Sequence, residues 1–521
     1  MCEFERFVLF LFIAQDFDPF MLLVAAILKG EPVVKKQKRL RTILLTYILV
    51  LCSNMVVFAS ETGEQHNLGE LLPVWSVFPF VGMLLSIAIF PLIKPEWWEH
   101  HMLKVVVFWS LVFLVPFGFA FGGEMLVLNI LEIVLLDYLP FIVLLFGLFV
   151  VAGGIILRGT LIGTPKVNII LLLIGTVLAS WVGTTGASML LIRPVIRANQ
   201  WRQKKAHIIV FFIFLVSNIG GCLTPVGDPP LFLGFLRGIP FFWTMKLFPM
   251  FLLNSGILLT VLYFLDRYYY EKELAAGRRP SDVEDAQVKK PLRVEGLLNL
   301  VFMGMIIGAV ILNGVLPNSA VFADQVTGEV YGVHVFEGIV VGYNSIVQMA
   351  IILIAAFLSM KTTRKAIRTD NCFTWACIKE VATLFIGIFI TMIPALSLLK
   401  AHGASLGITS PMEFFWATGA LSSFLDNAPT YLVFLTTAGS LGVAKGLITT
   451  VGTVSAKALM GISAGAVFMG ANTYIGNAPN FMVRSIAEEN KIAMPSFFGY
   501  MLWSLCILIP LFFIDTLIFF L

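Results

Sequence analysis

Charged residues are scarce in this chain of 521 residues, because Asp, Glu, Lys and Arg make up only 13% of it while 59% of the residues are hydrophobic. Soluble domains usually contain about 25% charged residues. A soluble core could not bury this much apolar surface, so we expect the chain to fold in lipid. Charge-free runs of roughly 20 residues recur along the sequence, and each is long enough for a membrane-spanning helix. A β-barrel would instead show short alternating segments.

Cysteine is also rare. The six cysteines, at positions 2, 52, 222, 372, 377 and 506, form no Cys-x-x-Cys motif and have no histidine cluster beside them. Neither a disulfide framework nor a cysteine metal site is therefore indicated. The sequence shows no Ser-His-Asp set, metal-ligand spacing or phosphate-binding loop. We therefore expect neither an enzyme nor a resident cofactor, and no nucleic-acid partner.

The first 60 residues differ from the rest of the chain. Basic residues between Lys35 and Arg41 precede an apolar run from Thr42 to Phe58, and the small residue Ala59 follows. This order is typical of a secretory signal. We interpret residues 1–60 as an N-terminal extension that holds a signal or an anchor. For residues 1–34 the alternatives are an extra membrane anchor or a start codon further downstream.

Basic segments indicate which loops face the cytoplasm. The strongest are Arg193–Lys205, Arg267–Arg293 and Lys361–Arg368, whereas Pro317–Glu337 contains no Lys or Arg and is expected outside. The polar segment 266–295 reads as a cytoplasmic linker. It separates a first transmembrane repeat, residues 61–265, from a second, residues 296–521.

The two halves contain related motifs. Residues 221–232 and 470–481 share Gly, Thr, Gly, Pro and Phe at an offset of 249, which places Asp228 opposite Asn477. A weaker match sets 184–188 against 426–430. The apolar run 139–157 leads towards basic residues, whereas its counterpart 381–399 leads away from them. Related halves of opposite orientation are typical of secondary transporters. The predicted fold is an all-α polytopic membrane protein with two inverted-topology repeats and discontinuous helices.

Four polar segments rich in Gly or Pro interrupt the apolar runs, at 183–186, 218–230, 422–429 and 470–479. Non-helical backbone persists in a membrane only where protein buries it or where it lines a wet cavity. Such breaks at corresponding places in two repeats predict a transport site. Hard cations prefer oxygen ligands, and we extend that preference to Na⁺. The candidate hydroxyl and amide ligands are Thr184, Thr185, Ser188, Asn218, Thr224, Ser422, Ser423, Asn427, Thr430, Asn472, Thr473 and Asn477.

Two carboxylates lie in these segments. A charged side chain at the centre of a membrane span costs roughly 3 kcal/mol on insertion scales and is functional by default. Asp228 and Asp426 each have a helix-breaking Gly or Pro beside them, and no Lys or Arg. Burial favours the protonated carboxyl, so a proton and Na⁺ would compete for it. We predict that Asp228 and Asp426 bind Na⁺ or H⁺.

With the segments Gly220–Asp228 and Ser423–Pro429 in view, the chain resembles the ion transporter superfamily. Within it, the glycine-rich Thr-Pro-x-Gly-Asp sequence looks most like that of NhaD-type Na⁺/H⁺ antiporters. Arsenite permeases and citrate and dicarboxylate symporters are more distant. The resemblance covers roughly residues 71–521. It implies a homodimer with scaffold helices beside a mobile transport domain, and re-entrant hairpins near Gly183–Arg197 and Phe414–Asn427. It also implies that Asp228 and Asp426 match acidic positions tied to antiport.

The first functional hypothesis is therefore exchange of Na⁺ (or Li⁺) for H⁺ across the inner membrane. The alternative is Na⁺-coupled citrate or dicarboxylate symport, or arsenite efflux. An anion would need a positive group in the site, and only Arg193 or the N-termini of half-helices could supply one. Ser188 is followed by Met189 and Leu190, so the Ser-Asn-Thr signature of the dicarboxylate branch is missing. This argues against a carboxylate substrate, whereas Asn477, where an acid would be expected, leaves the proton stoichiometry open.

Overall fold

The computed structural model describes residues 68–278, 291, 293–325, 327, 329–336, 338–371 and 373–521. The predicted signal or anchor therefore lies outside the described residues. The described parts are helical apart from three short antiparallel strand pairs, β1–β2, β3–β4 and β5–β6. Nine of the described helical stretches are long and apolar enough to cross a membrane. The prediction of an all-α polytopic membrane protein is confirmed.

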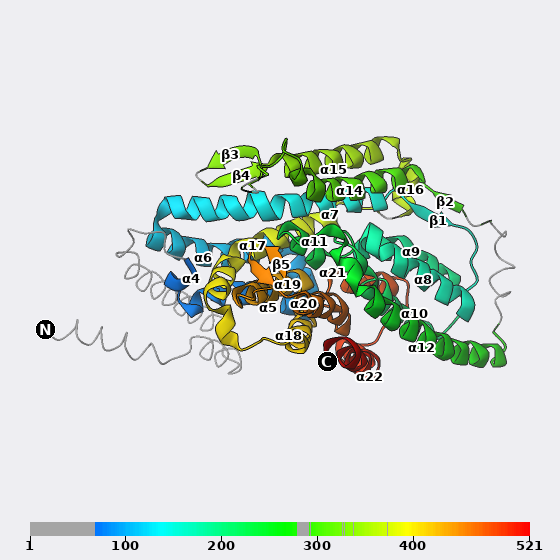
Figure 1. The fold of residues 1–521 in the computed structure, drawn as a ribbon. Coiled ribbons are helices and arrows are strands. Elements are labelled where there is room, and N and C mark those ends of the chain that lie inside the picture. The colour runs from blue at the N-terminus through cyan, green and yellow to red at the C-terminus, as the bar shows by residue number, and fades with distance from the viewer. Residues whose placement is uncertain are drawn as a thin grey trace, which may run out of the picture.

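The first half runs from α4 to the long helix α12 (Figure 1). Its elements are α4 (Leu68–Leu71), the 3₁₀ helix η1 (Val74–Val77), α5 (Phe78–Ile93), α6 (Pro95–Glu132), the π-helix η2 (Ile133–Tyr138), α7 (Leu139–Ala152), β1 (Ile156–Arg158), α8 (Pro165–Val182), α9 (Thr184–Ala198), α10 (Ala206–Leu215), η3 (Ile219–Leu223), α11 (Pro229–Leu236), η4 (Phe241–Leu247) and α12 (Phe248–Ala275). The segment 266–295 was expected to be a linker, but its first ten residues, up to Ala275, are the last turns of α12.

The second half follows with a similar alternation of long and broken helices. Its elements are β2 (Arg293–Glu295), α14 (Leu298–Val315), η5 (Leu316–Asn318), β3 (Gly332–Phe336), β4 (Ile339–Gly342), α15 (Tyr343–Thr362), α16 (Lys365–Asp370), α17 (Ala376–His402), η6 (Gly403–Leu406), α18 (Pro411–Ser422), α19 (Asn427–Ser440), β5 (Leu447–Thr449), β6 (Gly452–Val454), α20 (Ala456–Met469), η7 (Gly470–Asn472), α21 (Ala478–Glu489), α22 (Phe497–Asp515) and the π-helix η8 (Thr516–Phe520).

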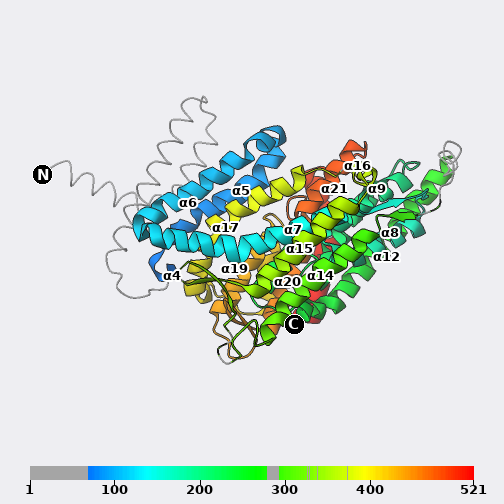
Figure 2. The same ribbon diagram turned by 90° about the horizontal axis from the view of Figure 1, so that it is seen from above.

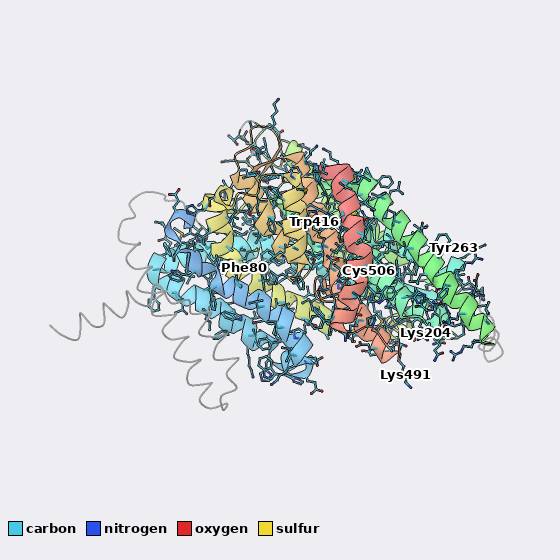
Figure 3. All side chains as sticks on the ribbon, turned by 90° about the horizontal axis from the view of Figure 1, so that it is seen from below. Phe80, Lys204, Tyr263, Trp416, Lys491 and Cys506 are labelled. Carbon is cyan, nitrogen blue, oxygen red and sulfur yellow. The ribbon has the colours of Figure 1, made fainter. Side chains whose placement is uncertain are left out.

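Figure 2 shows two groups of helices side by side. Helices α5, α6 and α17 pack against one another on one side, and α8 packs against both α9 and α12 on the other. Helices α7, α14 and α15 pack together, and α14 and α15 lie along the upper face of the molecule in Figure 1. In the view from below, Cys506 lies on α22 and Tyr263 on α12 (Figure 3). Lys204 and Lys491 lie towards one end of the molecule in the same view.

The described residues of the basic segments predicted to be cytoplasmic lie at one end of the molecule. There β1 pairs with β2, and Arg158 forms ion pairs with Glu295 and Asp370. Arg193 also reaches this end, since its guanidinium donates to the carbonyl of Asn371. The β3–β4 hairpin lies at the opposite end (Figure 1). Helix α7 therefore runs towards the basic end and α17 runs away from it, as inverted repeats require.

Hydrogen bonds repeat between the two halves at the sequence offsets of the motifs. In the first half Ser180 donates to the carbonyl of Gly220, and its own carbonyl accepts from Thr224. The second half repeats both bonds: Ser423 donates to the carbonyl of Met469, and its own carbonyl accepts from Thr473. Ser423 follows Ser180 by 243 residues, and Met469 and Thr473 follow Gly220 and Thr224 by 249. Asp228 and Asn477, at an offset of 249, have nearly equal backbone angles (φ −144°, ψ 141° and φ −151°, ψ 140°). The two halves are therefore related in structure as well as in sequence.

Each half contains a helical hairpin that ends inside the molecule. The first is α8–α9, whose turn is Gly183 at φ 84°, a conformation that favours glycine. Its two outer ends are joined by hydrogen bonds of 2.8 and 3.0 Å between Asn168 and Asn199. The second is α18–α19, which turns through 423–426. Gly183 and Asp426 therefore lie in the two hairpin turns, and the re-entrant segments that the resemblance placed near Gly183–Arg197 and Phe414–Asn427 each form one part of these hairpins.

Candidate functional site

Asp228 lies at a break in the middle of the molecule, between η3 and α11. Pro229 and Pro230 start α11, and a residue before proline avoids helical backbone angles. Asp228 is therefore extended and sits at the N-cap position with its side chain free to turn inwards. Only 1% of its surface is exposed.

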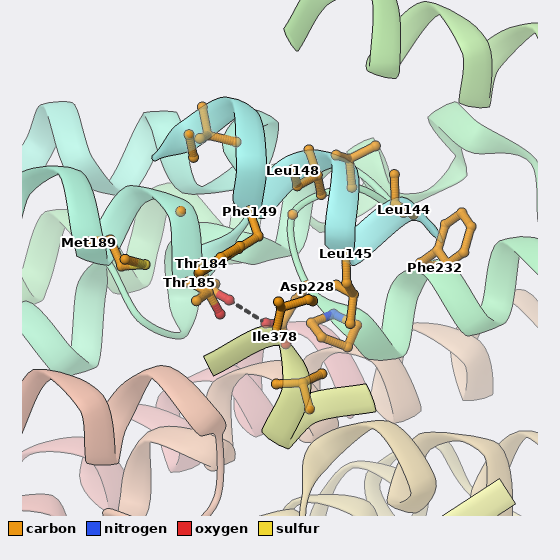
Figure 4. A pocket seen from close by; sticks show the side chains of 18 of the residues that line it. Leu144, Leu145, Leu148, Phe149, Thr184, Thr185, Met189, Asp228, Phe232 and Ile378 are labelled. Carbon is orange, nitrogen blue, oxygen red and sulfur yellow. Dashed lines mark hydrogen bonds between the residues drawn. The ribbon is translucent and has the colours of Figure 1, made fainter. Parts of the chain in front are cut away.

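Three donors from three separate elements converge on this carboxylate. Thr184 Oγ1 donates to Asp228 Oδ1 over 2.8 Å, as Figure 4 shows, and Asn427 Nδ2 donates to Oδ2 over 2.5 Å. Asn477 Nδ2 lies 3.3 Å from Oδ1. Thr184 and Asn427 are the first residues of α9 and α19, so both helices direct their N-termini at Asp228. The partial positive charge of a helix N-terminus stabilises an anion placed there.

The turn of the first hairpin and the turn of the second occupy equivalent places in the two halves. This equivalence corrects the alignment of residues 184–188 with 426–430. That match set Thr184 against Asp426. In the structure Thr184 and Asn427 begin their helices and both donate to Asp228, so Thr184 corresponds to Asn427 and Gly183 to Asp426. The predicted match is therefore out of register by one residue, because short polar turns share too few identical residues to fix an alignment.

Asp426 has a different environment from Asp228. It is partly exposed and caps α19, since its Oδ1 accepts from the backbone N–H of Ala428 over 3.1 Å. Its carbonyl accepts from Thr430 Oγ1 over 2.9 Å. Among the described contacts, no hydrogen bond joins Asp426 to Asp228. The geometry thus assigns Asp426 the bonds of a helix cap, and its role as an ion ligand stays a prediction.

The remaining candidate side chains fall into two groups. Amides surround Asp228 in a connected network: Asn477 donates to Asn218 Oδ1 over 3.3 Å, and Asn218 donates to Asn480 Oδ1 over 2.7 Å. The buried Ser188 hydroxyl lies 2.9 Å from that of Ser217. The second group donates its hydroxyls to backbone carbonyls and so fixes the broken helices; it comprises Thr224, Ser422, Ser423, Thr430 and Thr473.

Two amide oxygens in the site have no hydrogen-bond donor among the described atoms. Asn427 Oδ1 and Asn472 Oδ1 are both buried and unpaired, although Asn472 Nδ2 donates to Ser423 Oγ over 2.9 Å. An unsatisfied buried acceptor costs roughly 1–3 kcal/mol. A cation would remove that cost, and carbonyl oxygens are suitable ligands for hard cations. Oxygen donors of this kind could coordinate a hard cation.

A cavity of about 70 Å³ opens beside Asp228, between α9 and α11 on one side and α7 and α17 on the other (Figure 4). Its polar side chains are Thr184, Thr185, Asp228 and Cys377, and the rest of its wall is apolar. No Lys, Arg or His lines it. One water needs about 10–15 Å³ of such space, so the cavity holds a few waters or a small hydrated ion. Arg193 lines a different pocket, nearer the basic end.

Cys377 gives a direct test that this cavity is on the transport route. A small aqueous methanethiosulfonate reagent is expected to reach Cys377, fill the cavity beside Asp228 and inhibit transport. The variant Cys377→Ala is expected to be resistant, whereas Cys506→Ala, which removes an exposed thiol elsewhere, is expected to remain as sensitive as the wild type. Inhibition that persists in Cys377→Ala would place the transport route elsewhere.

Sequence reasoning missed several buried polar residues. Ser180 lies in an apolar run, and its equivalence to Ser423 was the available signal. Asn480, one residue beyond a predicted segment, donates to the carbonyls of Gly470 and Thr473. Asp515 is fully buried and binds Asn254 Nδ2 over 2.8 and 3.0 Å.

A family model described as "Putative citrate transport" matches residues 69–520, nearly the whole chain. No curated protein matches the chain. The superfamily expected from the two motifs is thereby confirmed. The chain therefore belongs to this citrate-transport family, part of the ion transporter superfamily, and is a multi-pass membrane transporter.

Proposed function

We propose that the protein exchanges Na⁺ or Li⁺ for H⁺ across the cell inner membrane, as NhaD-type antiporters do. The observation that carries the proposal is the Asp228 carboxylate, buried at a meeting point of hairpin turns and facing a small cavity without a basic side chain. A cation site needs an anionic ligand and oxygen donors, and this site offers both. A homodimer is part of the proposal.

The hydrogen bonds suggest why one ion at a time would bind. A carboxylate offers about four acceptor positions. Thr184 and Asn477 use two on Oδ1, and Asn427 uses one on Oδ2. The position left on Oδ2 can take either a proton or a cation. Binding one would exclude the other, which is the requirement for exchange.

The position of the cavity suggests how access would alternate. It lies where the short helices α9 and α11, which border the breaks at Gly183 and Asp228, face α7 and α17. Rigid movement of one group against the other around a fixed site is the usual plan of such folds. In this proposal, the hairpins and α11 carry Asp228 with its ion past the apolar side chains of α7 and α17.

Citrate transport is the second candidate, because it is the description of the family that matches residues 69–520. Helix N-termini at the site could bind a substrate carboxylate. However, Asp228 already supplies an anion to the N-termini of α9 and α19, and a negative side chain would repel citrate. The cavity of about 70 Å³ is also small beside the roughly 300–1,000 Å³ of typical organic-ligand pockets.

Everted membrane vesicles distinguish the two candidates. With an acid interior established, we expect Na⁺ or Li⁺ to collapse the pH gradient, and citrate to leave it unchanged. Vesicles without the protein are the control. Uptake of labelled citrate, with no response to any monovalent cation, would overturn the exchanger and favour the family description.

A further inference from the structure

A second pocket, of about 230 Å³, lies at the basic end of the molecule and is separate from the Asp228 cavity. It is formed by the last turns of α9, by β1, by the residues that end α16, and by Asn490 after α21. Its charged lining is Arg193, Arg197 and Asp370. Asp370 is engaged in an ion pair with Arg158, which also pairs with Glu295 at 3.0 Å.

The two pocket arginines, in contrast, have no carboxylate partner among the described residues. They are four residues apart on α9, so they share one face of the helix. Arg193 donates to the carbonyl of Asn371 over 3.2 Å and Arg197 to that of Leu157 over 3.1 Å. A guanidinium has five N–H donors, so most donors of both side chains are left over.

The positive charge in this pocket is also concentrated. Although Arg197 as a whole is an exposed residue, partial desolvation of its guanidinium, and then repulsion from Arg158 and Arg193, lower the pKa of this group. Arg197 is exposed in the last turn of α9, where a cation is favourable, but Arg193 is half-buried one turn earlier. The helix end and the positive-inside rule account for Arg197, and they do not explain Arg193, a second guanidinium that lines the pocket with no carboxylate partner among the described residues.

The other polar side chains of the pocket have few donors to spare, since the Asn371 amide uses both of its hydrogens and the Asn490 amide uses one of two. Asn371 Nδ2 already donates to the carbonyls of Gly153 and Ile155, both over 3.2 Å, and Asn490 Nδ2 donates to the carbonyl of Ile486 over 2.8 Å. An anion in the pocket would therefore depend on Arg193 and Arg197. Paired guanidiniums match the planar, bidentate geometry of phosphate and carboxylate.

We propose that the pocket formed by Arg193 and Arg197 binds an anionic phosphate group, from a lipid head group or from a free phosphate compound. Basic pockets between helices on the cytoplasmic side are suited to anionic head groups. The site has a mechanical consequence. Thr184, at the start of α9, holds Asp228, and Arg193 and Arg197 lie about 14 and 20 Å further along the same helix at 1.5 Å per residue. A bound phosphate would tie the end of α9 to the end of α16 and restrain the hairpin that carries the ion site.

The test measures binding, so its outcome does not depend on which ion is transported. Purified full-length protein in detergent is titrated with phosphatidylglycerol and followed by native mass spectrometry, with phosphatidylcholine as the uncharged comparison. The variant R193Q/R197Q is expected to bind phosphatidylglycerol roughly tenfold more weakly or worse. The control R267Q/K272Q removes the same charge from exposed positions on α12 and is expected to bind like the wild type.

A second arm separates the two sources of phosphate. Inorganic phosphate that raises the melting temperature of the wild type but not of R193Q/R197Q, without phosphatidylglycerol binding, would support the site and identify a free phosphate ligand. R193K/R197K retains the charge and is expected to bind with intermediate strength, which guards against a folding defect in the glutamine variant. Equal binding of both ligands by R193Q/R197Q and wild type, or no binding of either by the wild type, would overturn the proposal.

Discussion

Replacing Asp228 with Asn is expected to abolish Na⁺-driven collapse of the pH gradient in everted vesicles. The substitution keeps the size of the side chain and removes its charge. Loss of a buried charge partner costs about 3–5 kcal/mol, and each 1.4 kcal/mol is tenfold, so we expect apparent Na⁺ affinity to fall by about 100-fold or more. Asp228 has no Lys or Arg partner among the described ion pairs, so no basic residue would be left unpaired.

The matched control is Glu271→Gln, which neutralises an exposed carboxylate paired with Arg267 on α12. Its transport is expected to equal that of the wild type. Wild-type Na⁺ affinity in Asp228→Asn, in a monodisperse protein, would remove Asp228 from the ion path and leave the proposed exchange without its anionic ligand.

Asp426→Asn answers a separate question, because Asn caps a helix about as well as Asp. The substitution keeps the bond from Ala428 N–H and removes only the charge. If Asp426 is an ion ligand, transport will fall as in Asp228→Asn. Near-normal transport would restrict Asp426 to the cap that the structure shows.

The sequence predicted the elements whose signals are local. Charge-free runs gave the membrane spans, and the shared glycine and proline spacing paired Asp228 with Asn477, which the structure brings within 3.3 Å. The predicted breaks at corresponding places do meet in the structure, because Thr184, Asn427 and Asn477 from three of them contact Asp228 in the fourth. Of the predicted ligands, Thr184, Asn427 and Asn477 contact Asp228 directly.

Pairings between distant residues could not be read in the same way. Asp137 binds Arg237 over 2.6 Å, and 100 residues separate them. No periodicity or motif connects such residues, and only the packing of η2 against the end of α11 reveals the pair. The same holds for Asp515, which lies just beyond a charge-free run and binds Asn254 across 261 residues. The distinction between a ligand and a helix cap, as for Asp426, also depends on side-chain geometry.

The largest such cluster leads to the second prediction, that Arg202→Met severely destabilises the protein. The Arg202 side chain is fully buried and pairs with the equally buried Asp266, and its Nε lies 3.4 Å from Glu273. Asp266 also accepts from Asn168 over 2.9 Å and lies 2.8 Å from His207.

This cluster joins the outer end of the first hairpin and the start of α10 to the last turns of α12. Removing one partner of a buried ion pair costs about 3–5 kcal/mol, because the remaining charge stays buried without compensation. We expect Arg202→Met to lower the melting temperature in detergent and the yield of monodisperse protein. Arg267→Gln removes an exposed ion pair, which contributes about 0–1 kcal/mol, and should change neither.

The variant R202M/D266N/E273Q separates charge from packing. It removes the stranded carboxylates together with the arginine, and replacing a whole buried ion cluster is often tolerated. We expect it to recover a large part of the lost stability. Recovery would show that Arg202 acts by neutralising Asp266 and Glu273, and a melting temperature as low as that of Arg202→Met would show instead that the guanidinium packs the hairpin against α12. Wild-type stability of Arg202→Met would contradict both, and would mean that the hairpin is held by its apolar contacts alone.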